Sequence, residues 1–399
     1  MDDPRKILSM KVSEMPGYGF DCSCGRHHSV DINRIITGTG ILNQLPEAIA
    51  EFKDKTILVV ADDNTVKIGG YKVKQLLDDN GFKTELLVLE YPDYPVLLPD
   101  ERIVGTLLVH TTDDVGLLLG VGSGTINDLC KIVSYKMKLP FVIVGTAPSM
   151  DGYASVMAPL IVDRQKITYP AHYPYVIIED SELLDTAPPI MKKAGFGDII
   201  GKYTALADWR LAHKVNGDHY CDIVAEMVQS AVDKCVANLE GYFNGEAEAT
   251  NIMSDTLLLT GISIGLIGYT RPASGSEHHL AHYWELDGIA RGVEHPLHGN
   301  SVAMGSIASA EVYKIMRTRF EVVDSVNPPD PDMLREIYAR AGMALTPMEL
   351  GIDAGLFNRA LNNGYRIRPR YTIFNFTKAQ GMLPEIADLV TIKMCGGLE

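Results

Sequence analysis

The chain has 399 residues, which is longer than a single hydrophobic core usually grows, so two domains are expected. Its composition, 46% hydrophobic and 22% charged, is that of a globular protein. The 51 acidic side chains outnumber the 36 basic ones and give a net charge of −15. This balance argues against a nucleic-acid or anionic-membrane partner, because both require a basic face.

The N-terminus and the cysteines indicate the compartment. Met1–Met10 carries charges throughout and lacks the apolar core of a signal peptide. The most apolar run, Leu257–Tyr269, is too short to span a bilayer. Six cysteines are spread widely along the chain, and no disulfide framework is expected. We therefore expect a cytoplasmic protein with reduced thiols and no membrane span.

Residues 1–31 are expected to be irregular, and they contain Cys22, Cys24, His27 and His28. A Cys-x-Cys pair beside two histidines could be half of a zinc site. A structural zinc ion normally takes four ligands, however, and no second cysteine pair follows at a suitable spacing. The favoured interpretation is a loop whose small thiols pack near the core.

From Lys55 the sequence alternates strands with helices. Short apolar runs predict buried strands, and helical spacing between them predicts connecting helices. This alternation gives a parallel sheet that binds ligands at the carboxyl ends of its strands. Ala158–Ile178, rich in Pro and Tyr, is expected to form a ribbon that ends the first domain. The predicted strands are Thr56–Ala61, Lys83–Leu89, Val115–Val121 and Pro140–Val144; the predicted helices are Val66–Asn80, Asp100–His110, after a proline-rich connection, and Ile126–Lys136.

After about Asp185 helical spacing dominates and strand-like runs disappear. The sequence therefore predicts the α/β class. A Rossmann-like parallel-sheet domain, residues 1–184, would precede an all-helical domain, residues 185–399, with the active site in the cleft between them. The predicted helices are Lys192–Lys214, Tyr220–Glu240, Glu248–Tyr269, Glu277–Leu286, Gly299–Arg319 and Asp332–Ala341, followed by shorter ones.

A glycine-rich loop, Gly122-Ser123-Gly124-Thr125, joins a predicted buried strand to a helix. Bare backbone N–H groups and the positive end of a helix dipole would then face an anion. The alternative is a plain strand-to-helix turn. Asp62, just past the first strand, could accept bonds from a ribose, or could be an N-cap or turn residue. It lies about 60 residues before the loop, whereas an ordinary Rossmann site has its acid about 20 residues after it.

Three places in the helical half could carry metal chemistry. Asp198 and Lys202 share one helical face at i and i+4, although a local ion pair is the simpler reading. His278 and His282 have the same spacing, and His295 and His298 follow. One carboxylate with two imidazoles is the ligand set of a catalytic Zn²⁺, and Ni²⁺, Fe²⁺ and Mn²⁺ also fit.

The motif order GSG-T-x-x-D, T-A-P-S-M-D-G-Y, G-D-x-x-x-K, E-H-x-x-x-H and H-G-N-S-V resembles the iron-containing alcohol dehydrogenase and dehydroquinate synthase-like superfamily. Within it the chain is most similar to the sn-glycerol-1-phosphate dehydrogenase family. The resemblance covers residues from about Asp31 to the 390s. It implies that NAD or NADP is the cofactor, with Asp62 on the adenosine ribose and the glycine loop on the pyrophosphate. The residues implied for the cofactor are Asp62, Gly122, Ser123, Gly124, Thr125, Asp128, Thr146, Ser149 and Tyr153.

The resemblance also assigns the metal and the substrate. Asp198, His278 and His298 would hold one divalent metal, with zinc preferred, nickel or iron as alternatives, and His295 as the rival third ligand. Asp151 would contact substrate hydroxyls, and His282 is a candidate proton donor. An anionic substrate also needs cations, and Lys202 and Arg271, beside Asp198 and Ser274–His278 in sequence, are the nearest candidates for binding its phosphate. The triplet Arg366, Arg368 and Arg370 could also reach it, but a solvated loop is the favoured reading.

The implied reaction is the reversible NAD(P)H-linked reduction of dihydroxyacetone phosphate, a small phosphorylated triose, to sn-glycerol 1-phosphate. The resemblance also implies a homodimer or larger homo-oligomer. Two alternatives stay open. The first is a polyol or glycerol-type alcohol dehydrogenase acting on an unphosphorylated substrate, and the second is a catalytically silent NAD- and metal-binding sensor.

Overall fold

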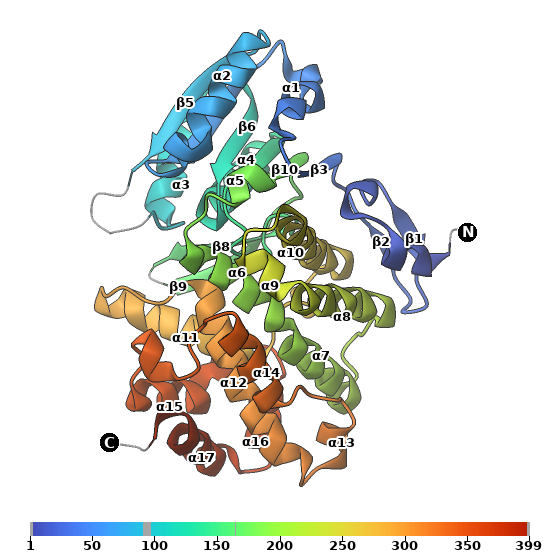
Figure 1. The fold of residues 1–399 in the computed structure, drawn as a ribbon, viewed down its shortest axis with the longest axis vertical. Helices are drawn as coiled ribbons and strands as arrows, with labels where there is room; N and C mark the ends of the chain where they lie inside the picture. The colour runs from blue at the N-terminus through green and yellow to red at the C-terminus, as the bar shows by residue number, and fades with distance from the viewer. Residues whose placement is uncertain (1–2, 91–96, 164, 397–399) are drawn as a thin grey trace.

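A computed structural model describes residues 3–90, 97–163 and 165–396 of the chain. Its centre is a six-stranded parallel sheet with the strand order β3-β10-β7-β6-β4-β5 (Figure 1). Helices make up most of the remaining chain, so the predicted fold class is confirmed. The strands are β3 (Arg34–Gly38), β4 (Thr56–Asp62), β5 (Lys83–Leu89), β6 (Val115–Gly122), β7 (Phe141–Gly145) and β10 (Val176–Asp180).

The four strands predicted from apolar runs, β4 to β7, are confirmed to within one residue at either end. The sequence analysis did not predict β3. It placed most of β10 in the ribbon Ala158–Ile178, and that assignment was wrong. Strand β10 lies between β3 and β7, so each of these two strands is defined by partners distant in sequence. The ribbon itself is real and shorter: β8 (Met157–Val162) pairs antiparallel with β9 (Gln165–Pro170).

The connections between strands create a switch point in the sheet. The chain leaves β4 toward β5 on one side, and it leaves β6 toward β7 on the other. In open parallel sheets, ligands bind outside the carboxyl ends of strands at such a point. The helices of this half are α1 (Leu45–Ala48), α2 (Tyr71–Asp79), preceded by the π-helical turn Val66–Gly70, α3 (Glu101–His110) and α4 (Gly124–Met137). Much of the predicted proline-rich connection before α3 lies outside the described residues.

The second half of the chain is helical, as predicted. One predicted helix, Lys192–Lys214, is in fact two, α6 and α7, which meet at Gly201. A Cβ atom on Gly201 would lie 2.5 Å from Val302 Cγ1, so this position lets α12 approach closely. The helices are α5 (Ser181–Leu184), α6 (Pro189–Ile200), α7 (Lys202–Asn216), α8 (Asp222–Ala237), α9 (Leu239–Phe243), α10 (Ala247–Ile267), α11 (Ser276–Arg291), α12 (His298–Arg317), α13 (Glu321–Asp324), α14 (Pro331–Arg340), α15 (Ala354–Asn363), α16 (Ile373–Ala379) and α17 (Leu383–Cys395).

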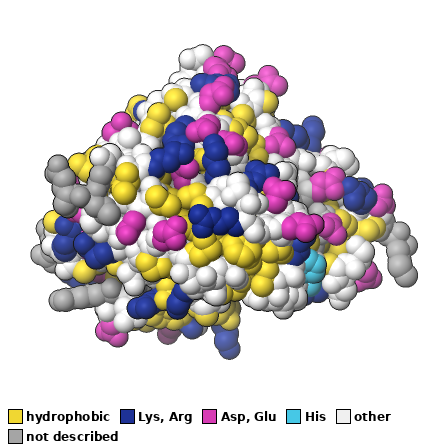
Figure 2. Space-filling model, turned by 90° about the horizontal axis from the view of Figure 1, so that it is seen from below, with side chains coloured by type: hydrophobic (Ala, Val, Ile, Leu, Met, Phe, Trp, Pro, Cys, Tyr) yellow, Lys and Arg dark blue, Asp and Glu magenta, His cyan; other side chains and the backbone are white. Residues whose placement is uncertain are grey.

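Helix α10 is long and apolar enough to cross a membrane by length and composition alone. However, 72% of its most apolar window is buried inside the protein, as in a core helix. On the face shown in Figure 2, basic and acidic side chains are interspersed, and no continuous basic surface forms there. Neither observation favours a membrane or a nucleic acid as partner.

The N-terminal segment is not irregular, contrary to expectation. Two short 3-10 helices, Pro4–Ser9 and Val12–Glu14, lead into a hairpin of β1 (Gly19–Asp21) and β2 (His27–Ser29). This hairpin lies beside α8 and α10, away from the parallel sheet (Figure 1). The proposed domain division at residues 184 and 185 stays a prediction.

Candidate active site

The glycine loop is built by close packing of α4 against β6. A Cβ atom on Gly122 would lie 2.5 Å from Ile126 Cγ1, so a larger residue would push the helix away from the strand. Ser123 is the N-cap of α4, which begins at Gly124. The main-chain N–H of Thr146 donates to the Gly122 carbonyl at 3.1 Å. The loop and the start of the β7–β8 connection therefore meet at the carboxyl edge of the sheet, beside the switch point.

Asp62 ends β4, on the other side of the switch point. The pairing of Val60 with Gly120 places Asp62 beside the end of β6. Its Oδ1 accepts main-chain N–H groups from Asn64 at 2.9 Å and Thr65 at 2.7 Å. The turn interpretation of Asp62 is therefore confirmed, and its contact with a ribose stays a prediction.

Tyr153 and Asp128, which were also expected at the cofactor, are buried beneath the glycine loop and the loop after β7. Tyr153 is buried, and its hydroxyl donates to the Ala147 carbonyl at 2.8 Å. Burial, ahead of other causes, raises the pKa of Asp128 to about 7. Its neighbour Lys131, which the sequence analysis did not single out, is buried and donates to the Gly152 carbonyl at 2.6 Å. Ser149 is half-buried on the same loop.

The three predicted metal ligands converge. Asp198 on α6, His278 on α11 and His298 at the start of α12 each offer an atom, and these atoms all lie within 4.8 Å of one another. His278 Nε2 is 3.5 Å from Asp198 Oδ1. The rival ligand His295 lies apart from this group, with its Nδ1 3.0 Å from the Pro296 carbonyl. We call Asp198, His278 and His298 the histidine–carboxylate cluster.

Buried carboxylates orient the imidazoles of this cluster. Glu277 Oε1 lies 2.8 Å from His278 Nδ1, and Glu285 Oε1 lies 2.6 Å from His298 Nδ1. The other oxygen of Glu285 lies 3.0 Å from His282 Nδ1. Carboxylates at Nδ1 leave Nε2 available, which is how metal-binding histidines are usually held. The donor set therefore fits a divalent metal such as zinc.

Glu277 and Glu285 were not predicted as site residues. The signal for Glu285 was its i,i+3 spacing from His282 on one helix. The two glutamates are fully buried. Although burial by itself would raise the pKa of Glu285, Lys166 and the nearby histidines outweigh it and hold that pKa well below its ordinary value.

Close backbone contacts bring the cluster together. A Cβ atom on Gly195 would lie 1.8 Å from the Pro148 carbonyl oxygen, and one on Gly299 would lie 1.7 Å from the Ala194 carbonyl oxygen. Helix α6 therefore touches both the loop after β7 and the start of α12 at main-chain distance. This contact sets Asp198 beside His298.

Lys202 is fully buried between two carboxylates. Its Nζ lies 2.6 Å from Asp198 Oδ1 and 2.7 Å from Asp151 Oδ2, so the local ion pair is confirmed and extends to Asp151. Burial alone would lower the pKa of Lys202, but the two carboxylates raise it above its ordinary value. Burial and the charge of Asp198 raise the pKa of Asp151. The charge of Lys202 is thus already balanced within the protein.

The other cations expected at a phosphate differ in their surroundings. Arg271 pairs with Asp218 and donates to the Tyr371 carbonyl, so the structure does not bring it to the cluster. Arg366 is exposed, as expected, although it ends the 3-10 helix Gly364–Arg366 and does not lie in a loop. The solvated-loop reading is wrong for Arg368 and Arg370, which are half-buried and hydrogen-bonded to other parts of the chain. Arg370 bonds the Ser274 carbonyl and Thr270.

Arg368 lies beside His282, whose ring stacks on that of His298 with centroids 5.2 Å apart. Its guanidinium donates to the Thr168 hydroxyl at 3.0 Å, and it lies 3.0 Å from His282 Nε2. Neither partner carries a negative charge. Burial, ahead of other causes, lowers the pKa of Arg368. A half-buried guanidinium whose hydrogen-bond partners are neutral is suited to receive an anion.

Comparison with known proteins agrees with this arrangement. The family model of the iron-containing alcohol dehydrogenases matches residues 36–188. Glycerol-1-phosphate dehydrogenase (NAD(P)+) from Halalkalibacterium halodurans is 32% identical, over 88% of this chain and 94% of that protein. The enzyme of the same name from Geobacillus stearothermophilus is 30% identical, over 92% of this chain and 98% of that protein.

Solved structures share the fold at lower identity. An iron-containing alcohol dehydrogenase from Thermotoga maritima gives a TM-score of 0.67 at 18% identity, covering 91% of this chain and 97% of that one. Glycerol dehydrogenase from Schizosaccharomyces pombe gives 0.65 at 18% identity, covering 93% and 95%. The fold and the histidine–carboxylate cluster thus define the class of iron-type alcohol dehydrogenases. Within that class, the chain belongs to the glycerol-1-phosphate dehydrogenase family.

Proposed function

We propose that this protein catalyses the reversible NAD(P)H-linked reduction of dihydroxyacetone phosphate to sn-glycerol 1-phosphate. One observation carries the proposal: relatives named for this activity share 30–32% identity over nearly their full length, and the chain keeps a converging Asp-His-His set. The likeness to glycerol dehydrogenases is at the level of fold alone.

The cofactor would bind at the switch point. The loop Gly122–Thr125 would hold the pyrophosphate with main-chain N–H groups at the start of α4, and Asp62 would face the adenosine ribose. The loop after β7, with Thr146 and Ser149, would line the nicotinamide side. When bound, the reduced nicotinamide supplies the hydride. The protein's contribution is to fix the ring against the substrate carbonyl.

The histidine–carboxylate cluster would hold one divalent metal, through Asp198, His278 and His298. When bound, such a metal supplies Lewis-acid polarisation of a carbonyl. Glu277 and Glu285 keep the imidazoles in the tautomer that offers Nε2. Lys202 compensates the buried charges of Asp151 and Asp198, so we assign it to positioning Asp198 rather than to the substrate's phosphate.

The phosphate of the substrate would bind Arg368. This guanidinium lies beside His282 and is held by neutral groups, whereas Arg271 and Lys202 are already paired with carboxylates. His282 Nε2 faces Arg368, and burial, ahead of that cation, keeps the pKa of His282 well below its ordinary value. His282 is therefore a neutral imidazole that positions Arg368. This argues against the role of proton donor that the sequence analysis considered for His282. Asp151 keeps its expected role at substrate hydroxyls.

One assay tests the activity, the metal and the substrate together. The protein is stripped with a chelator, reloaded separately with Zn²⁺, Ni²⁺ or Fe²⁺, and mixed with NADH or NADPH. Dihydroxyacetone phosphate, dihydroxyacetone and glyceraldehyde 3-phosphate are compared side by side by cofactor oxidation. We expect one metal to restore oxidation with dihydroxyacetone phosphate far above the other two substrates. A preference for dihydroxyacetone would replace the proposal with a polyol dehydrogenase, and no oxidation with any substrate would favour a sensor.

Assembly and compartment complete the proposal. We infer a homo-oligomer from the resemblance to the family, and gel filtration with light scattering tests it. We also propose a cytoplasmic location, because the six cysteines are free thiols in this structure. Cell fractionation with labelling of reduced thiols checks that proposal.

A further inference from the structure

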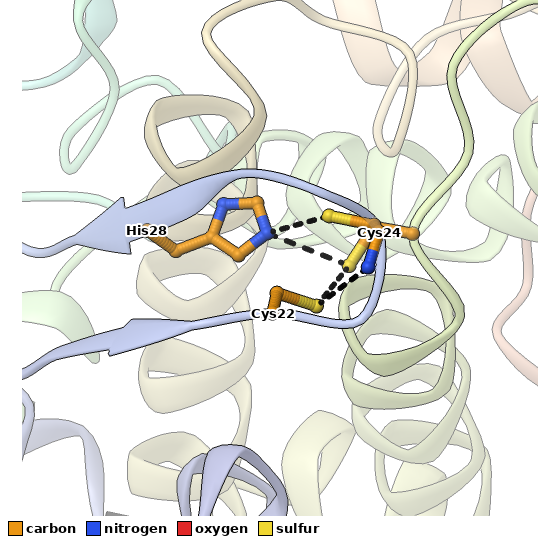
Figure 3. A group of neighbouring side chains, drawn as sticks. Cys22, Cys24 and His28 are labelled. Atoms are coloured by element: carbon orange, nitrogen blue, oxygen red, sulfur yellow. Dashed lines mark hydrogen bonds between the residues drawn. The ribbon is translucent and has the colours of Figure 1, made fainter. Parts of the chain in front are cut away.

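A second cluster of metal-binding side chains lies in the N-terminal hairpin. Cys22 and Cys24 lie in the turn between β1 and β2, and His28 lies on β2 (Figure 3). The fourth member, Cys221, is the N-cap of α8. One ligand atom from each lies within 4.8 Å of the other three. The hairpin and α11, which carries His278 and His282, lie on opposite sides of the view in Figure 1. The cysteine–histidine cluster is therefore separate from the histidine–carboxylate cluster.

Three of the distances between the four ligand atoms are close to those of tetrahedral coordination. Zn–S bonds of about 2.3 Å and Zn–N bonds of about 2.0 Å put neighbouring ligand atoms roughly 3.5–3.8 Å apart. Cys22 Sγ and Cys221 Sγ are 3.6 Å apart, and Cys221 Sγ is 3.6 Å from His28 Nε2. Cys24 Sγ is 3.2 Å from the same nitrogen. Three sulfurs and one nitrogen thus surround a point suited to one ion.

His28 is oriented as a ligand. Its side chain is buried, and its Nδ1 lies 2.6 Å from the Leu266 carbonyl at the end of α10. A carbonyl oxygen can only accept, so Nδ1 carries the proton and Nε2 presents its lone pair to the three sulfurs. A backbone carbonyl at Nδ1 is a usual support for a zinc-bound histidine.

The backbone around the cysteines favours thiolates. The N–H of Cys24 points at Cys22 Sγ, 3.5 Å away, across a tight turn in which Gly25 takes a φ of +84°. That left-handed conformation suits glycine. Cys221 is the N-cap residue of the long helix α8, a position where the helix dipole favours a negative sulfur. The cysteines thus come from two separate parts of the chain, the hairpin turn and the start of α8.

We propose that Cys22, Cys24, His28 and Cys221 bind one structural zinc ion. Three thiolates and one imidazole form a closed site with no open position for a substrate, which is the pattern of structural rather than catalytic zinc. The ion fastens the hairpin to α8, joining cysteines 199 residues apart. The hairpin has strands of three residues each, and such a small unit is not stable alone. The proposal does not rest on the dehydrogenase activity.

The test measures zinc in the full chain after the other site has been disabled. Asp198→Asn with His278→Gln removes two ligands of the histidine–carboxylate cluster. In this background we expect one zinc ion per chain by mass spectrometry of the metal. Adding Cys24→Ser should remove nearly all of it, whereas adding Cys395→Ser should leave it in place. Cys395 is a half-buried thiol outside the cluster and serves as the matched control.

Two further measurements do not require Cys24→Ser to fold. In the same background, cobalt substitution should give a thiolate-to-cobalt charge-transfer band in the near ultraviolet. A mercurial reagent that modifies thiols should release the zinc, which a metal-binding dye detects. Protein with negligible zinc and no such band overturns the proposal. So does a disulfide between two of the cysteines in freshly purified protein, seen as the loss of a hydrogen from each thiol. The background variant is expected to lack dehydrogenase activity, because two ligands of the histidine–carboxylate cluster are gone. Absence of activity in the unmutated protein, with zinc bound by the cysteine–histidine cluster, would count only against the proposed function.

Discussion

The main-chain N–H of Asp151 donates to Oδ2 of Asp198 at 3.2 Å. The loop after β7 thus holds one carboxylate oxygen of the histidine–carboxylate cluster, while Lys202 holds the other. Asp198 is therefore contacted by both halves of the chain. The affinity for a metal should depend on how firmly the surrounding carboxylates and helices hold this ligand and its neighbours.

Glu285→Gln should weaken metal binding by about 10- to 100-fold, because it removes the charge that orients two imidazoles. One oxygen of Glu285 faces His298 and the other faces His282. Competition with a chromogenic chelator measures the affinity. Asp287→Asn on the same helix, where the carboxylate pairs with Arg291, is the control. Equal affinities in wild type and Glu285→Gln would show that the glutamate does not support the ligands.

Arg368→Gln should raise the KM for dihydroxyacetone phosphate about 10- to 100-fold, because a charge-assisted bond is worth about 1.5–3 kcal/mol. Dihydroxyacetone, which lacks the phosphate, should be affected far less. Steady-state kinetics with both ketones give the ratio. Arg366→Gln removes a neighbouring cation that is exposed, and it should leave both KM values unchanged. An equal loss for both ketones in Arg368→Gln would exclude the phosphate contact and return attention to Lys202.

Gly195→Ala should destabilise the protein and loosen the metal site together. Its Cβ would meet the Pro148 carbonyl oxygen at 1.8 Å, and backbone cannot rotate away as a side chain can. We expect a loss of about 2–3 kcal/mol in the free energy of unfolding, measured with urea, and a lower metal content. Gly105→Ala in α3 is the control, because its Cβ would meet nothing within 4 Å. That change should be neutral or stabilising by up to about 1 kcal/mol. Similar effects for the two variants would contradict the close contact.

Glu179→Gln should change how stability depends on pH. Burial, ahead of other causes, raises the pKa of Glu179 from 4.5 to about 8. Within that window the folded chain keeps a proton that the unfolded chain has released, so this group lowers the free energy of unfolding as pH rises. Glutamine cannot ionise, and one pKa unit corresponds to about 1.4 kcal/mol.

As the pH rises from about 5 to about 8, the free energy of unfolding of Glu179→Gln should therefore increase by roughly 1–3 kcal/mol relative to that of wild type. Urea unfolding at both pH values measures this difference. Glu182→Gln removes a neighbouring carboxyl that is exposed, and its free energy of unfolding should depend on pH as that of wild type does. Parallel behaviour of Glu179→Gln would mean that Glu179 is ionised in the folded protein.

The fold was predictable where local signals are strong. Buried β-branched runs such as Thr56–Ala61 identify a strand without knowledge of its neighbours. Strand β3 could not be found in this way, because its partner β10 lies 142 residues later along the chain and decides its conformation. The break at Gly201 was equally hidden, since its cause is the approach of Val302 from another helix.

The site residues were likewise predictable only where a local sequence pattern marks them. The i,i+4 histidines His278 and His282 and the Gly-Asp context of α6 are visible in sequence, and the family resemblance then selects Asp198, His278 and His298. Arg368 and Cys221 gave no such signal. Each becomes meaningful only through a contact with a residue far away in sequence, His282 for one and Cys22 for the other. A search for a second cysteine pair near Cys22 could not succeed, because the missing ligand lies on α8.

The bond from His28 to the Leu266 carbonyl has a consequence for the order of folding. The hairpin is synthesised before its partners on α8 and α10, which follow some two hundred residues later. Contacts of such long range form slowly, because the closing of a long loop must come first. The hairpin can therefore reach its native contacts only after α8 and the end of α10 have been made.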